Sequence, residues 1–318
     1  MFSEWWSHFL LDALALLVAL ALDRLLPEPP NAVHPVVWMG RATGWLARFA
    51  PKPPAGAFLY GCAVVVLLIG ASGFLAWLAM TGLMALGPVA YVLLGALILR
   101  TTFTVRGLSA AGAATRRALE GNRLDDARES LRSLVSRDAA TLTPHLVAAA
   151  AVESVAENTT DSYISPWLAF AILGVPGAVA YRAVNTLDSM LGYRGPNEYF
   201  GKAAARLDDV VNFIPALISA LFLLVSGALM RLPAARARRG VLRDRHLTAS
   251  PNAGWTMGAA AHLLGTELEK PGHYRLGEGL RRPEPGDIGL AVRLSEHTAV
   301  LAVLAALALL AARHAVMA

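Results

Sequence analysis

A cluster of acidic and amide residues inside an apolar stretch is the feature that most constrains this chain. Between Glu153 and Asn212 such residues interrupt sequence that is otherwise largely apolar. Ionised carboxylates in these surroundings are costly unless they bind something. Several of them recur at helical spacing, so each group should share one helix face. The set is Glu153, Glu157, Asn158, Asp161, Asn185, Asp188, Asp208, Asp209 and Asn212.

The chemistry of this set favours a hard metal ion. Its donors are all oxygen, little histidine lies near, and the only cysteine is Cys62, in a distant apolar run. A single cysteine excludes an intrachain disulfide and a thiolate zinc site. Carboxylate and amide oxygens suit Mg²⁺ bridged to phosphate. We therefore expect a membrane enzyme that handles a phosphorylated substrate.

Composition supports a membrane protein. Hydrophobic residues make up 56% of the chain, charged residues 16%, and the mean hydropathy is +0.50. The net charge of +5 comes from arginines in loops that flank apolar segments, a pattern that records membrane orientation more often than nucleic-acid binding. We expect an all-α, polytopic helical bundle in contact with membrane lipid, and no nucleic-acid partner.

Six stretches approach the roughly 20 apolar residues that cross a bilayer. The first is not a cleavable signal, because no basic residue precedes it and Asp12 and Asp23 interrupt it. The fourth contains Gly174, Pro176 and Gly177, which predicts two half-helices or a re-entrant element. The stretches are Phe9 to Leu26, Ala57 to Met80, Leu86 to Leu99, Pro166 to Val184, Val210 to Met230 and His297 to Ala312.

Two polar insertions, 100–162 and 231–296, complete a single membrane domain that covers residues 1–318. The first insertion mixes arginines and acids at helical spacing, which predicts a solvated helical hairpin. Thr143-Pro144 then provides an N-cap and a first-turn proline for a helix that carries Glu153 and Glu157. Neither insertion shows strand alternation or a nucleotide-binding glycine loop, so both are expected to be helical.

Charge asymmetry predicts the orientation in a bacterial inner membrane, crossed several times. No Lys or Arg precedes Phe9, whereas Arg24, Arg41 and Arg48 follow the first span, so the N-terminus should lie outside and both insertions in the cytoplasm. Full crossings by the fourth and fifth stretches would place 185–209 outside. We favour re-entrant or folded-back segments, which bring all the acidic groups together on the cytoplasmic side.

Several polar residues have ordinary alternatives to a functional role. Arg206 could pair with Asp208 or Asp209, and Arg182 and Lys202 could be snorkelling cations rather than phosphate contacts. His34, taken alone, is more often a hydrogen-bonded structural residue than a base. Asn252, in Ser250-Pro251-Asn252, reads first as part of a turn, although such a turn can present N–H groups to an anion.

Taken together, these residues closely resemble one family, the cobalamin-biosynthesis membrane proteins called CobD or CbiB, which are adenosylcobinamide-phosphate synthases. The resemblance spans nearly the whole chain and has two visible departures. Pro27-Glu28-Pro29 stands where the family usually has Gly-Asp-Pro, and Arg182 stands where lysine is common. The matching runs include Leu22-Asp23-Arg24, His34-Pro35-Val36, Ser136-Arg137-Asp138, Glu153 to Asn158 with Asp161, Tyr181 to Met190, Gly192-Tyr193, Ala205 to Asp209, Asn212 to Ala216 and Ser250 to Gly254.

The resemblance implies a reaction and its partners. The expected substrates are adenosylcobyric acid, a corrinoid, and (R)-1-aminopropan-2-ol or its O-phosphate, joined as an amide with ATP as co-substrate and Mg²⁺ as cofactor. An acyl phosphate is the expected use of ATP, because a free carboxylate condenses with an amine too slowly. Association with other cobalamin-assembly enzymes is also possible under this hypothesis.

On this hypothesis each candidate residue has a role. Glu157, Asp161, Asp188, Asp208 and Asp209 hold metal, and Glu157, Asp188 and Asp208 are also catalytic. His34 and Glu153 are alternative bases. Asn158, Asn185 and Asn212 orient ligands, and substrate or phosphate contacts come from Asp23, Arg182, Tyr193, Lys202, Arg206 and Asn252.

Two other functions remain open from the residues alone. An intramembrane prenyl- or phospho-transferase would also hold Mg²⁺-diphosphate between paired Asn-x-x-Asp groups. A cation transporter or a membrane assembly protein could use the carboxylates as an ion path.

Overall fold

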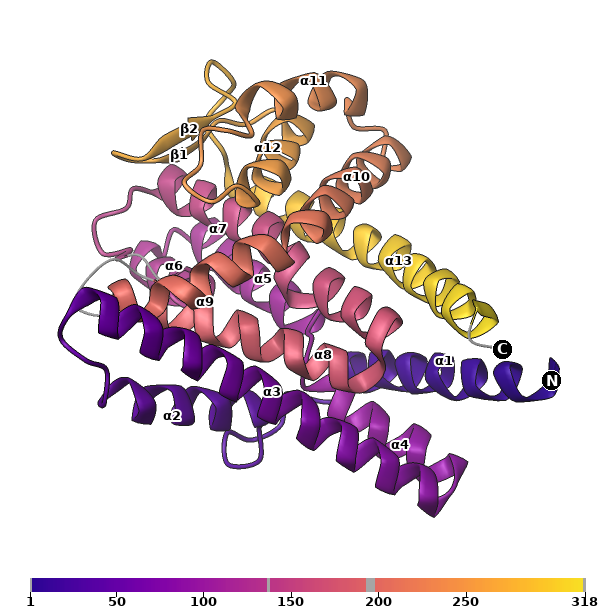
Figure 1. The fold of residues 1–318 in the computed structure, drawn as a ribbon. Helices are drawn as coiled ribbons and strands as arrows, with labels where there is room; N and C mark the ends of the chain where they lie inside the picture. The colour runs from indigo at the N-terminus through magenta and orange to yellow at the C-terminus, as the bar shows by residue number, and fades with distance from the viewer. Residues whose placement is uncertain (1, 136–137, 193–197, 317–318) are drawn as a thin grey trace. The chain divides into compact units, whose positions relative to one another are not determined.

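The computed structural model describes residues 2–135, 138–192 and 198–316. Over these residues the fold is all-α apart from one small hairpin (Figure 1). The chain divides into two compact units. Unit 1 comprises Met1–Thr104, Ser165–Val211 and Val303–Ala318, and unit 2 comprises Val105–Ile164 and Asn212–Ala302. Most of the first polar insertion and all of the second belong to unit 2.

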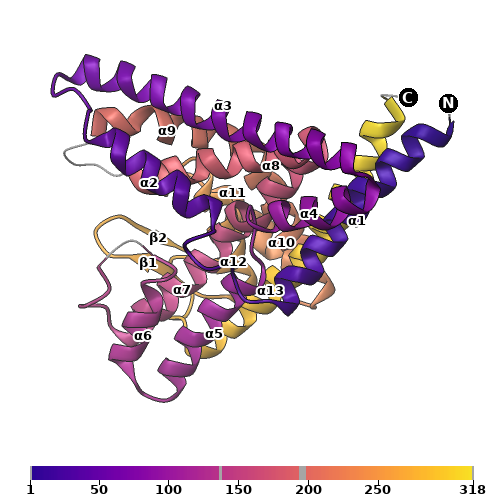
Figure 2. The ribbon, with the colours of Figure 1, turned by 90° about the horizontal axis from the view of Figure 1, so that it is seen from below.

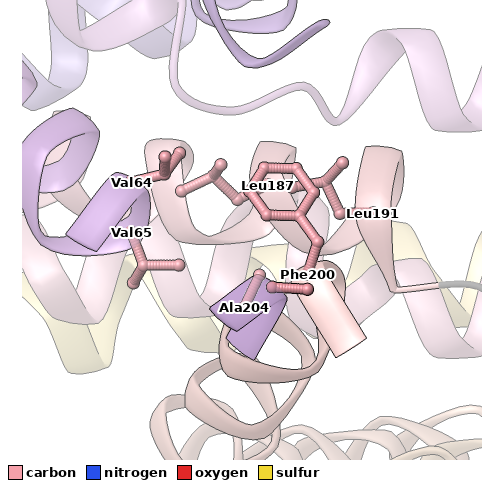
Figure 3. Close-up of a cluster of buried hydrophobic side chains, with 7 residues drawn as sticks. Val64, Val65, Leu187, Leu191, Phe200 and Ala204 are labelled. Atoms are coloured by element: carbon pink, nitrogen blue, oxygen red, sulfur yellow. The ribbon is translucent and has the colours of Figure 1, made fainter. Parts of the chain in front are cut away.

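Unit 1 is built from helices of 13 to 33 residues, most of them apolar, and the end of the C-terminal helix. They are α1 (Phe2–Leu25), α2 (Pro35–Ala47), α3 (Pro54–Leu86), α4 (Pro88–Arg100), α8 (Ser165–Leu191), α9 (Glu198–Val211) and the end of α13 (Pro285–Val316). Helix α3 packs along both α8 and α9, and α1 packs on α4. A core of Val64, Val65, Leu187, Leu191, Phe200 and Ala204 joins α3, α8 and α9 (Figure 3).

Unit 2 holds the helices of both polar insertions and one apolar helix between them. They are α5 (Arg106–Glu120), α6 (Leu124–Leu131), α7 (Pro144–Thr159), the π-helical turn η1 (Thr160–Ile164), α10 (Phe213–Leu229), α11 (Ala234–Asp244), α12 (Ala253–Leu264) and the start of α13. The predicted helical hairpin is confirmed as α5 and α6, with ion pairs at helical spacing such as Arg116–Glu120 at 2.7 Å.

The second insertion, predicted to be helical, also contains one short hairpin. Strands β1 (Leu268–Lys270) and β2 (Tyr274–Leu276) form an antiparallel hairpin that packs on α7 (Figure 2). Each strand has three residues, which is too short for an alternating pattern to stand out in the sequence.

Three helices are long and apolar enough to cross a membrane, or four if α9 and α10 form one broken span, counted over the described residues. The three are Pro54–Leu86, Pro144–Leu191 and Pro285–Val316. The second starts well before the predicted Pro166, because α7 continues through η1 into α8 without a loop. Helix α4 has 13 residues, short for a full crossing.

Helix α8 is broken where the glycines and the proline predicted. Gly174 has φ 70° and ψ −165° inside the helix, a conformation that is essentially restricted to glycine. Pro176 also lacks the N–H that would complete the helical ladder. The half-helices of the sequence prediction therefore meet at Gly174.

Candidate functional site

Acidic residues of α8 and α9 lie together in unit 1. Asp188 on α8 and Asp209 on α9 are half-buried and close enough for their charges to interact. Asp208 is the neighbour of Asp209 and is also half-buried. Because the Leu187, Leu191 and Phe200 side chains pack into the core between these helices (Figure 3), the helix faces that carry the acids are fixed relative to each other.

An arginine bonded to Asn185 and a glycine beside Asp188 lie on the same stretch of chain as this acidic pair's α8 member. The Arg182 Nη1 donates a hydrogen bond to Asn185 Oδ1 at 3.1 Å, one turn before Asp188. A Cβ atom added at Gly192 would overlap the Asp188 carboxylate. Glycine therefore leaves the space in which the Asp188 side chain lies.

A small polar pocket in unit 1 brings together three residues that the sequence had separated. Its volume is about 190 Å³, and Asp23, His34 and Arg182 all line it. Asp23 is buried and accepts a hydrogen bond from Thr104 Oγ1 at 3.2 Å. The other lining residues are Glu28, Pro29, Asn31, Val36, Val37, Arg100, Thr101, Phe103 and Thr104.

Arg100 is a residue of this pocket that sequence reasoning missed. It is buried, and its Nη2 donates to the carbonyl oxygens of Leu26, at 2.8 Å, and Pro27. In the sequence it stands only as the first residue of the polar insertion 100–162. Its burial was the information that the sequence lacked. The pocket thus holds two guanidinium groups and two carboxylates.

The His34 ring has a structural duty at the start of α2. It is the N-cap residue, and its Nδ1 accepts a hydrogen bond from the Val36 backbone N–H at 3.3 Å. Burial lowers the pKa of His34, and the charges of Arg182 and Arg100 lower it further against the opposing effect of Glu28. The ring is therefore neutral at pH 7 and carries its proton on Nε2.

In unit 2 the acidic residues Glu153 and Glu157 lie on α7, as the sequence predicted. Glu153 is buried and Glu157 and Asn158 are half-buried on α7. The Asn158 Nδ2 donates to the Ser154 backbone oxygen at 2.9 Å and to Ser154 Oγ at 3.1 Å. Asp161 lies in the π-turn η1, whose wider pitch shifts it from the regular one-turn step that we expected from Glu157.

One helix start in this unit differs from the prediction. Thr143 stands at the N-cap of α7 as expected, but its side chain makes no capping bond and contacts His145 instead. Asn252 and Asn212 occupy the N-cap positions of α12 and α10, also without side-chain capping bonds. Both are buried.

The remaining candidates lie on α9 or outside the described residues. Lys202 is exposed, with its Nζ 5.8 Å from the centroid of the Tyr199 ring, a cation–π contact. Arg206 is exposed on the same helix. Tyr193 falls outside the described ranges, as do Ser136 and Arg137 of the matching runs.

The donor set fits a magnesium ion shared with phosphate better than a protein-enclosed metal. Over the described residues, no three His, Cys, Asp or Glu side chains are grouped as ligands for one ion. The Asp188–Asp209 pair supplies two carboxylates, with the Asn185 amide one turn away. Mg²⁺ is commonly held by one or two carboxylates together with substrate phosphates and water.

Comparison with known proteins gives the same family that the sequence motifs resemble. The family model described as CobD/Cbib protein matches residues 16–308. A cobalamin biosynthesis protein CobD of Dehalococcoides mccartyi is 42% identical over 92% of this chain and 95% of its own length. The cobalamin biosynthesis protein CbiB of Salmonella typhimurium is 37% identical over 86% of this chain and 87% of its own length. No solved structure matches the chain. The chain belongs to the CobD/CbiB family of cobalamin-biosynthesis proteins.

Proposed function

We propose that this protein forms an amide bond between the carboxylate of adenosylcobyric acid and (R)-1-aminopropan-2-ol or its O-phosphate, with ATP and Mg²⁺. The observation that carries the proposal is the family match over residues 16–308, which includes the acids of both units. The acid pair of α8 and α9 and the charged pocket of unit 1 supply groups suited to this chemistry.

The reaction needs an activated acyl group. The substrate carboxylate oxygen takes the γ-phosphoryl group, and ADP leaves. The amine nitrogen then attacks the acyl carbon, the C–O bond to phosphate breaks, and the nitrogen loses a proton. Bound Mg²⁺ would neutralise phosphate charge during these steps. Asp188 and Asp209 of unit 1 would hold it, with Asp208 as a further candidate ligand. The metal roles of Glu157 and Asp161, which belong to unit 2, stay predictions from the sequence.

The charged pocket suits the smaller substrate. Its volume is about 190 Å³, whereas pockets for drug-sized ligands usually measure about 300–1,000 Å³. The pocket is therefore too small for a corrin ring. Arg100 and Arg182 would attract phosphate or developing negative charge, whereas Asp23 and Glu28 would attract an ammonium group.

The tautomer of His34 decides whether this ring can act as the general base. Because Nδ1 already accepts the Val36 N–H, the neutral ring presents a donor at Nε2. A donor can orient a phosphate or hydroxyl oxygen but cannot accept the amine proton. Under this proposal His34 positions the substrate, and Glu153 remains the candidate base.

The test is reconstitution of purified protein with adenosylcobyric acid, ATP, Mg²⁺ and each amine in turn, with product mass as the readout. Asp188→Asn and Asp208→Asn should each lower turnover by about 100-fold or more, and Asp125→Asn, an exposed acid on α6, should not. Near-normal turnover in both active-site variants would reject the metal role. Consumption of a polyprenyl diphosphate instead would favour the transferase.

A further inference from the structure

A stripe of aromatic and basic side chains runs along the outer face of α2. Trp38, Trp45 and Phe49 are exposed by 51%, 56% and 58%, and Arg41 and Arg48 are also exposed. Trp38, Arg41 and Trp45 follow the helical repeat and share one face with the C-cap residue Arg48. Phe49 lies in the turn just past the end of α2. The opposite face of α2 packs on α8 and α3 (Figure 2).

The aromatic side chains of this stripe are held in place. The Trp38 Nε1 donates to the Ala32 carbonyl oxygen at 2.9 Å, and Trp45 and Phe49 make an edge-to-face contact at 5.0 Å. Large rings kept on a surface expose apolar area that water solvates poorly. Tryptophan beside arginine is the composition of helices that lie in a membrane interface.

An apolar pocket opens beside the stripe. Its volume is about 390 Å³, and α2, α3, α4 and α8 line it with side chains such as Trp38, Met39, Leu75 and Ile98. Helices α3 and α8 belong to candidate membrane spans. The pocket shares Val36, Thr101 and Arg182 with the polar pocket, so one end is apolar and the other carries a cation.

We propose that this face binds an anionic phospholipid. Its head group lies against the cations of the α2 stripe, and an acyl chain enters the apolar pocket. The positive charge of this face selects an anionic lipid. An acidic leaflet attracts the side chains of Arg41, Arg48 and the neighbouring Lys52, whereas a zwitterionic leaflet adds no such electrostatic binding energy. Lipid binding does not require amide formation, so each proposal is tested separately.

The experiment uses the intact, detergent-solubilised protein without substrate. Palmitoyl-oleoyl phosphatidylglycerol, phosphatidylcholine with the same chains, and inorganic phosphate are added separately, and retained ligand is measured by native mass spectrometry. Phosphatidylglycerol should bind at least tenfold more tightly than phosphatidylcholine. Equal retention of the two lipids would overturn the proposal, and so would phosphate binding that is as tight as that of phosphatidylglycerol.

Variants separate the head-group site from the chain site. Arg41→Gln with Arg48→Gln should weaken phosphatidylglycerol about 30-fold, at roughly fivefold per cation, whereas the exposed pair Arg236→Gln with Arg239→Gln on α11 should not. Ala71→Phe, which fills the apolar pocket, should weaken both lipids. Leu67→Phe, exposed on the same helix and outside the pocket lining, is its control. Unchanged binding in both test variants overturns the proposal.

Discussion

Two glycines determine how closely α3, α8 and α9 approach one another. A Cβ atom at Gly61 of α3 would overlap the Phe200 carbonyl oxygen of α9, and one at Gly201 of α9 would overlap the Leu191 carbonyl oxygen of α8. Backbone cannot move aside as a flexible side chain can. These contacts therefore hold the helices that carry Asp188 and Asp209.

Gly61→Ala and Gly201→Ala should each lower the stability of the protein in detergent by about 1–3 kcal/mol, because a methyl group must displace backbone. Gly70→Ala, also on α3 but with no atom within 4 Å of the added Cβ, should be neutral or slightly stabilising. Thermal unfolding of the purified variants measures both effects. A Gly61→Ala protein as stable as Gly70→Ala would contradict this packing argument.

Asp244 joins three segments of unit 2. Its buried carboxylate accepts hydrogen bonds from His262 Nε2 at 2.8 Å, from the Gly277 N–H at 2.8 Å and from Arg243 Nε at 2.6 Å. Burial acts to raise the pKa of Asp244, but the bonds from Arg243, Gly277 and His262 overcome it and lower the pKa to about 2.

This carboxylate makes stability depend on pH. Because its folded pKa lies below the unfolded value, the contribution is complete above about pH 4 and is lost as the pH falls through 2. Asp244→Asn should cost about 2–4 kcal/mol at pH 7 and reduce the loss of stability in acid. Thermal unfolding between pH 7 and about pH 2 tests this. Asp125→Asn, whose carboxylate is exposed and paired with Arg128, should change little.

At the scale of elements, the break in α8 is supported by the end of α13. Gly174 departs from helical geometry, and Arg313 Nη1 donates to the Phe170 carbonyl oxygen at 3.3 Å, the acceptor that lies four residues before the break. Asp12 of α1 holds Arg313 in an ion pair and also accepts from Tyr91 at 2.6 Å and His314 at 2.9 Å. Intramembrane charges are rarely retained without such pairing.

Arg313→Gln should loosen this break, because it leaves Asp12 without its guanidinium partner and weakens the bond to Phe170. We expect faster hydrogen exchange at residues 172–177 and a loss of stability of about 3–5 kcal/mol. Arg313→Lys should recover part of the stability, since it restores the charge but not the forked geometry. Exchange that matches the unchanged protein in Arg313→Gln would show that Arg313 does not support the break.

For the whole molecule, the distribution of charge predicts the side of the membrane on which each polar segment lies. The arginine distribution predicts both insertions in the cytoplasm and the N-terminus outside. The expected convergence of the acidic groups places the 185–209 segment on the cytoplasmic side as well. Single cysteines can be introduced at exposed positions of a Cys62→Ala protein. Their reaction with a membrane-impermeant maleimide shows on which side of the membrane each position lies.

Arg123→Cys in unit 2, Glu278→Cys after the hairpin and Glu198→Cys on α9 should react with an impermeant maleimide only after permeabilisation. Ser7→Cys should react in intact cells. Labelling of Glu198→Cys in intact cells would place the start of α9 outside and would reject the folded-back arrangement.

The sequence by itself determined the membrane class, the helical hairpin of α5 and α6, the break at Gly174 and the family. Each follows from local or collinear information: apolar length, charges one turn apart, a glycine beside a proline, and matching runs. The same local rules place Asp188 and Asn185 on one face, but they do not identify the partner of that face.

Only the tertiary structure decided which distant groups meet. Asp12 and Arg313 are 301 residues apart and form an ion pair, and Arg100 turns inward to the carbonyls of Leu26 and Pro27. Asp188 of α8 lies close enough to Asp209 of α9 for the two charges to interact. The physical reason is that helical periodicity is a short-range property of the backbone. Burial and pairing of charge depend on how side chains from separate helices pack, and no spacing in a single sequence records that.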